Sequence, residues 1–177
     1  MKTDCASVRH RCAIGQALLV AGVVALGSVS CGAQQAVYSQ PALRPEAALQ
    51  AALAAQQACR QQGFQVSVAV VDRDGIPQVL LRDRFAGVHT VQVASDKAWT
   101  AASFHNSTAQ LALETQAGKA MSGMRNLPRF MAVAGGLPLE SAGALVGAIG
   151  VSGAPGGDAD ARCAQAGLDA VAEALAF

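Results

Sequence analysis

Apolar and polar positions along the chain follow helical spacing in some segments and strict alternation in others. Residues 45–62 carry Leu49 and Leu53 on one alanine-rich face, which is typical of an amphipathic helix. Proline and an acidic residue open this segment, and Gly63 follows it as a helix-ending residue does. The first element of the domain is therefore predicted to be a helix.

A hairpin is predicted directly after this helix. Valines alternate with other residues at positions 66, 68 and 70, which is the pattern of a strand. The Asp-Gly pair at 74–75 favours a tight turn between antiparallel strands. The return strand is predicted over residues 76–82.

The remaining pattern predicts further helices and three more strands. Helical spacing returns over residues 90–104, and a final helix follows Asp158, which is predicted to cap it. The other segments are a short helix at 108–116 and strands at 130–134, 137–140 and 145–151. We therefore expect a single α+β domain, in which about five mostly antiparallel strands are flanked by helices.

Length and charge narrow the classes of function. The chain has 177 residues and a formal net charge of +1, which fits one domain of moderate size. It has no basic stripe, and its aromatic content is 4%. Nucleic acid is therefore disfavoured as a partner, because such proteins use clustered cations and stacking aromatic side chains.

The first 33 residues have the plan of a secretory signal. Lys2, Arg9 and Arg11 precede an apolar run at 13–27, which is followed by small residues. His10 separates the two arginines, so the general secretory route is favoured over the twin-arginine route. We expect an exported protein, periplasmic or secreted.

Two kinds of processing fit the end of this signal. Residues 28–31 resemble a lipoprotein signal, which would leave Cys31 acylated and the protein anchored to a membrane. Residues 31–33 also suit an ordinary signal peptidase. In either case residues 34–42 are a short linker, and the domain is expected over residues 43–177.

Two cysteines lie in the predicted domain. Cys59 and Cys163 fall in its first and last long helices, and they would form one disulfide if these helices packed side by side. Two buried thiols are the favoured interpretation, because the sequence does not give their separation. No CxxC pair or neighbouring histidine indicates a zinc site.

Four separated motifs resemble those of the HbpS/GlcG-like family. This family is a haem-binding or "haem-degrading" domain, which is also found at the C-terminal end of PduO-type proteins. They occur in the family's order at residues 97–104, 135–139, 147–154 and 163–164. The resemblance implies a small domain that assembles into a homo-oligomer, often an octamer. The resemblance also links the chain to haem, iron or corrinoid metabolism. Because the chain has an export signal, haem (a tetrapyrrole) is the favoured ligand, and the expected role is haem capture, storage, sensing or slow turnover.

His105 is the candidate ligand for haem iron, with Thr108 beside it. His105 follows the motif helix, and Thr108 matches a threonine that the family often places after a proline, although Ser107 stands here instead of proline. Both are therefore predicted to face one cleft. His89, Met121 and Met124 are further candidate donors.

Three cations are candidates for binding the haem propionates. They are Arg82, Arg84 and Lys97, the nearest basic side chains in sequence to the motif helix. Arginine suits carboxylates because its planar fork donates two parallel hydrogen bonds. Lys97 lies within an apolar helix, where a charged side chain is unusual.

Other functions remain open. One is an enzyme or accessory subunit that binds a small carboxylate metabolite, of the glycolate or propanediol type, against Lys97 and the helix start at 153–158. Another is a purely structural subunit. Serine hydrolysis is disfavoured, because residues 150–154 end in alanine where the nucleophile elbow needs glycine and no histidine follows them.

Overall fold

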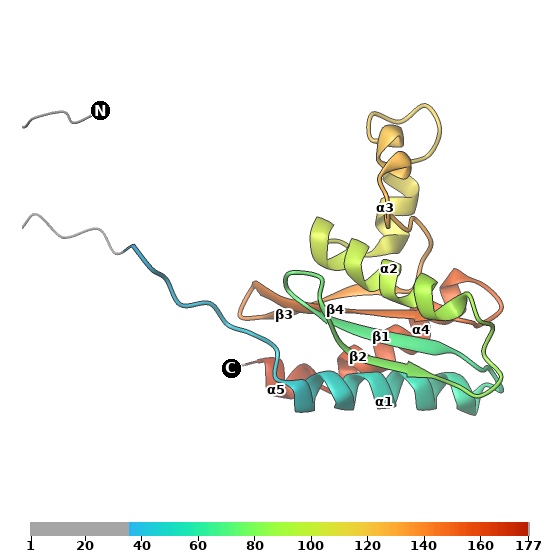
Figure 1. The fold of residues 1–177 in the computed structure, drawn as a ribbon, viewed down its shortest axis with the longest axis horizontal. Helices are drawn as coiled ribbons and strands as arrows, with labels where there is room; N and C mark the ends of the chain where they lie inside the picture. The colour runs from blue at the N-terminus through green and yellow to red at the C-terminus, as the bar shows by residue number, and fades with distance from the viewer. Residues whose placement is uncertain (1–35, 177) are drawn as a thin grey trace, which may run out of the picture. The chain divides into compact units, whose positions relative to one another are not determined.

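A four-stranded antiparallel sheet with helices on both faces forms the centre of the domain (Figure 1). The computed structural model describes residues 36–176, and residues from Ser39 onward form one compact unit. The strands are β1 (Ser67–Asp72), β2 (Pro77–Arg82), β3 (Gly136–Ser141) and β4 (Ala144–Ser152), in the order β2-β1-β4-β3. The predicted α+β class is confirmed, with four strands where about five were expected.

The helices divide between the two faces of the sheet. They are α1 (Pro45–Gln61), α2 (Thr90–Phe104), α3 (Thr108–Glu114), α4 (Gly157–Asp169) and α5 (Ala172–Leu175), with the 3₁₀ helix η1 (Ser122–Asn126). Helix α2 covers one face, and α1 and α4 cover the other (Figure 1). Strand β1 is consequently buried on both faces: Val68 and Val70 join the core under α1 and α4, and Ala69 and Val71 join the core under α2.

Small residues let α2 lie close to β4. A Cβ atom added at Gly150 would come within 2.2 Å of the Ala94 carbonyl oxygen and 2.6 Å of the Ala98 amide nitrogen. No side chain fits at this position, because real Cβ atoms do not approach backbone so closely. The strand therefore needs glycine where the helix crosses it.

The predicted hairpin turn is confirmed between β1 and β2. The Asp72 carboxylate accepts hydrogen bonds from the backbone N–H groups of Asp74 and Ile76, each at 2.9 Å. Gly75 has a φ of +78°, which glycine adopts without strain. The two strands pair antiparallel from Ser67 opposite Arg82 to Val71 opposite Pro77.

The prediction of a strand over residues 130–134 is wrong. Thr100 of α2 binds the backbone there instead: its hydroxyl donates to the Arg129 carbonyl oxygen at 3.2 Å and accepts from the Met131 N–H at 2.9 Å. Only Phe130 in this segment is buried, and its ring packs edge-on against Phe104 with the ring centroids 5.0 Å apart. Apolar content alone therefore misidentified a loop as a strand.

Asp158 does not cap α4, contrary to the sequence prediction. The N-cap residue is Gly156, with a φ of +140°, and no side chain bonds to the helix start. Asp158 is exposed in the first turn. A negative side chain still stabilises that position, because the first turn carries the positive end of the helix dipole.

Cys59 and Cys163 form a disulfide, so the expectation of two thiols is wrong. Helices α1 and α4 lie side by side under the sheet (Figure 1), which brings the two Cα atoms to 5.5 Å. That separation is normal for a disulfide. The bond joins the first and last long helices across a sequence separation of 104 residues.

Helix α3 and η1 form an arm that projects away from the sheet beyond α2 (Figure 1). The predicted secretory signal at 1–33, with Cys31, lies outside the described residues. Between residues 36 and 176, no helix has the length and apolar character needed to cross a membrane.

Candidate functional site

A cleft of about 530 Å³ opens at one end of α2. Three segments meet there: the residues that follow α1, the loop between β2 and α2, and the glycine-rich turn between β4 and α4. The side chains and backbone that line it come from Gly63, Phe64, Gln65, Phe85, Gly87, His89, Thr90, Val93, Lys97, Val133, residues 152–157 and Asp160. Apolar side chains, polar side chains and glycines therefore share the wall around a small number of ionisable groups.

Lys97 and Asp160 form a buried ion pair at this cleft. The Lys97 ammonium donates to the Asp160 carboxylate (Nζ to Oδ2) at 2.7 Å and to the Val151 carbonyl oxygen at 2.9 Å. The side chains are only 1% and 5% exposed. Burial lowers the pKa of Lys97 below its ordinary value of 10.5, and the hydrogen bond and charge of Asp160 oppose this shift only in part.

Asp160 also fixes the glycine-rich turn. Its second carboxylate oxygen accepts from the Ala154 N–H at 2.9 Å. Gly135 lies against the pair, because a Cβ atom there would come within 2.8 Å of Asp160 Cβ and 2.9 Å of Lys97 Nζ. One carboxylate thus connects α2, the end of β4 and the turn that walls the cleft.

His89 places an imidazole at the mouth of the cleft. It is the exposed N-cap residue of α2, and its ring lies over Gly87. A Cβ atom at position 87 would come within 2.7 Å of the ring carbon Cε1. Glycine therefore leaves the space that the ring occupies.

Of the predicted propionate-binding residues, Arg84 and Lys97 belong to this end of α2. The Arg84 guanidinium lies 5.6 Å from the ring centroid of Phe85, a cleft residue that is 78% exposed. Arg82 ends β2, and its guanidinium donates to the Ala86 carbonyl oxygen. Lys97 lines the cleft and is already paired, whereas Arg84 is exposed and is the sequence neighbour of the cleft residue Phe85.

His105 and Thr108 lie at the opposite end of α2. The helix has 15 residues, so about 22 Å separates its ends. His105 is exposed and ends the helix in the left-handed conformation, with a φ of +50°. The Thr108 hydroxyl is buried and accepts from the Gly136 N–H at 2.8 Å. Neither residue lines the cleft, and the structure does not place them with Lys97.

Sequence reasoning missed Asp160 and Gly87. Asp160 precedes Cys163 and Ala164 by three and four positions, so helical spacing places it on their buried face. An acidic residue on a buried face needs a partner, which was the available signal. For Gly87 the sequence offers no signal, since its role depends on the direction of the His89 ring.

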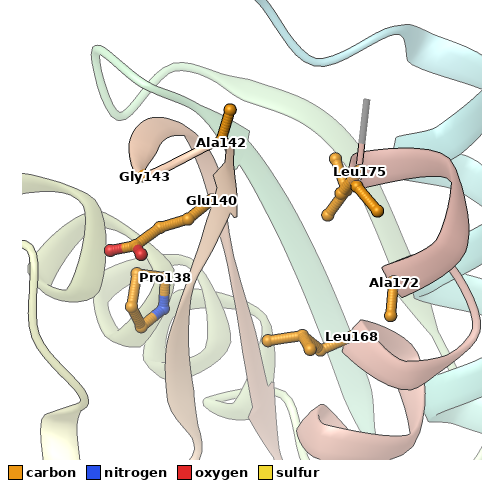
Figure 2. A pocket seen from close by; sticks show the side chains of 8 residues that line it. Pro138, Glu140, Ala142, Gly143, Leu168, Ala172 and Leu175 are labelled. Atoms are coloured by element: carbon orange, nitrogen blue, oxygen red, sulfur yellow. The ribbon is translucent and has the colours of Figure 1, made fainter.

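A second groove of about 490 Å³ lies between β3 and the two C-terminal helices (Figure 2). Pro138 and Glu140 line it from the strand, and Leu168, Ala172 and Leu175 line it from α4 and α5. Among the residues that the structure describes, Glu140 is the ionisable one that lines it, and no imidazole or cation joins it there. The cleft at α2 therefore carries the richer chemistry.

The fold and the cleft define a small α+β ligand-binding domain. The chain matches the family described as "Haem degrading protein HbpS-like" over residues 43–169, and it belongs to this family. It is similar to a crystallised double mutant of HbpS from Streptomyces reticuli, with 39% identity and a TM-score of 0.72, covering 77% of this chain and 92% of that chain.

Two further similarities extend the comparison. A structure described as a PduOC:heme complex has 29% identity and a TM-score of 0.69, covering 73% of this chain and 95% of that chain. An uncharacterized 15.0 kDa protein from the dhaT-dhaS intergenic region of Citrobacter freundii is 31% identical over 110 residues, covering 61% of this chain and 77% of that protein. One structural neighbour has thus been crystallised with haem.

Proposed function

We propose that this protein is exported and binds haem in the cleft at the start of α2, for capture, storage, sensing or slow turnover of the cofactor. The observation that carries the proposal is the imidazole of His89, which lies over Gly87 in a cleft that also holds the exposed apolar side chains of Phe85 and Val133. Membership of the HbpS-like family and the PduOC:heme neighbour support the choice of ligand.

The residues of the cleft suit haem. Imidazole is a common axial ligand of haem iron, and His89 is the residue that would supply it. Phe85 and Val133 are exposed apolar side chains that would cover the porphyrin, and Arg84 would bind a propionate at the rim. When bound, haem would supply iron redox and oxygen chemistry, while the protein's own residues bind it and exclude water from one of its faces.

Export is supported by the charged and apolar pattern of residues 1–33 and by the disulfide. Cys59 and Cys163 are paired, and structural disulfides persist in oxidising compartments such as the periplasm. A single domain with one buried disulfide fits that environment. The same arrangement would be unusual in a reducing cytosol.

We expect haemin to bind the full chain with a saturable Soret shift, and the His89→Ala variant to bind about tenfold more weakly or worse, because the iron loses its nitrogen ligand. Absorbance titration measures both. His105→Ala is the matched control, since His105 is also an exposed histidine at an end of α2. It should bind as the wild type does.

Other outcomes have distinct meanings. If His105→Ala or Thr108→Ala alters the Soret band and His89→Ala does not, haem binds at the far end of α2 and the cleft proposal fails. Equal, unsaturable uptake by all variants would argue against specific haem binding. Binding of a small carboxylate would then be the preferred function, because Lys97 and the turn at 153–157 line one cleft.

Processing of the N-terminus tests export. Expression in a Gram-negative host should yield a periplasmic fraction that lacks about the first 30 residues, because signal peptidases remove such segments. Intact-mass analysis distinguishes a new N-terminus after Ala33 from one that begins at an acylated Cys31. A full-length product confined to the cytoplasm would contradict the proposal.

A further inference from the structure

Lys97 is a buried nucleophile that haem binding leaves unused. The described residues contain two lysines, and the other one, Lys119, is exposed on the arm. Lys97 is 1% exposed, yet it lies on the wall of the cleft together with Asp160. A charged side chain in such a place needs an explanation beyond packing, because lysine is rarely fully buried.

We infer that Lys97 is a reactive amine that forms an imine with a short aldehyde or ketone entering the cleft. This activity does not require the proposed haem binding, which uses His89 and Arg84, but both ligands would occupy the same cleft. Lysine forms such imines with carbonyl substrates when an apolar environment keeps its amine neutral.

The contacts of Nζ suit this role. It donates to the Val151 carbonyl oxygen at 2.9 Å and to the Asp160 carboxylate at 2.7 Å. A neutral amine that donates both of its hydrogens to these two acceptors keeps its lone pair for an electrophile. Burial also lowers the Lys97 pKa, so a larger fraction is neutral than in an exposed lysine at the same pH.

Few charged groups face the amine. Asp160 on α4 is the nearest, and His89 is the other ionisable residue of the cleft wall. The start of α4 also faces the cleft through residues 156 and 157, and its positive dipole end disfavours an ammonium ion nearby. Asp160 favours the ammonium, and burial opposes it with the larger effect.

The reaction is a balanced condensation. The Lys97 nitrogen attacks the carbonyl carbon, so a C–N bond forms as the C=O π bond breaks. Asp160 carries one N–H proton from the nitrogen to the oxygen, which gives a carbinolamine with a hydroxyl group. Asp160 then carries the second N–H proton to this hydroxyl group, so that the C–O bond breaks, the nitrogen lone pair forms the C=N bond, and water leaves. The products are an imine and one water molecule, with no oxidation or reduction.

The residues around Lys97 favour a small, uncharged carbonyl compound. Val93 and Val133 are apolar, and the glycines at 153 and 157 contribute no side chain. Between residues 36 and 176, no lysine or arginine other than Lys97 lines the cleft, so a highly charged substrate would lack partners there. A chain of a few carbons is the class that fits.

Reductive trapping tests the inference. The full chain is incubated with propanal and sodium cyanoborohydride at neutral pH, and peptide mass mapping measures propylation of each lysine. We expect Lys97 to be propylated faster than Lys119 at neutral pH, because burial lowers the pKa of Lys97 and leaves more of its amine neutral. The faster reaction of Lys97 relative to Lys119 should disappear near pH 11, where exposed lysines are also largely neutral.

Variants separate chemistry from packing. Asp160→Asn keeps an oxygen acceptor but removes the negative charge that favours the ammonium ion, so the pH dependence of Lys97 propylation should shift to lower pH while that of Lys119 is unchanged. Lys97→Met should abolish the fast propylation at position 97 and leave the propylation of Lys119 unchanged. If native Lys97 reacts more slowly than Lys119, and reacts equally only in urea, the ion pair is closed to ligands and the inference is overturned. The wild-type result decides this even if a variant fails to fold.

Discussion

Replacing Cys59 and Cys163 with alanine is expected to lower the free energy of unfolding by about 3 to 5 kcal/mol. The bond closes a loop over a sequence separation of 104 residues, and a crosslink restricts an unfolded chain more as the loop lengthens. Both cysteines are fully buried between α1 and α4, so removal also leaves space in the core. Urea denaturation followed by circular dichroism measures the change.

Reduction of the wild type is the matched control for the space left by alanine. The reduced protein keeps both sulfur atoms, so its loss of stability reflects the crosslink alone. The Cys59→Ala/Cys163→Ala variant should not respond to the reductant, which shows that other thiols have no effect. If oxidised and reduced wild type unfold at the same urea concentration, the disulfide contributes nothing to stability.

Local signals predicted most of the fold. Helix α2 was expected over residues 90–104 and α1 over 45–62, and the structure agrees to within a residue. Local chemistry decides such elements: Pro45 opens a helix, Gly63 ends one, and Asp72 with Gly75 makes a turn. The strand order β2-β1-β4-β3 was not predicted, because pairing between distant segments leaves no local pattern.

The candidate site shows the same limit. Lys97 was selected because a lysine in an apolar helix is unusual, and the structure gives it a buried partner. That partner, Asp160, lies 63 positions away in the sequence and was missed. The disulfide was misjudged for the same reason, since nothing local indicates that α1 and α4 are neighbours. Residue types were therefore informative, whereas distances between elements were not.

Truncating Asp160 to alanine is expected to lower the free energy of unfolding by about 3 to 5 kcal/mol, because it leaves the Lys97 charge buried without a partner. The variant also frees the Ala154 N–H, which Asp160 binds at 2.9 Å. Asp158→Ala is the matched control, since Asp158 is an exposed acid in the same first turn of α4. Its loss should cost only about 0.3 to 1 kcal/mol, which is the contribution of the helix dipole.

Removing both charges separates folding from function. A Lys97→Met/Asp160→Leu variant should recover most of the stability lost by Asp160→Ala, because apolar pairs of similar volume often replace buried ion pairs without cost. Urea denaturation of the three variants measures this. If the double variant is as unstable as Asp160→Ala, the pair is needed for packing. If stability returns, the fold does not require the charges, and the reason for the pair lies in the cleft, where reductive trapping tests the proposed reactivity of Lys97.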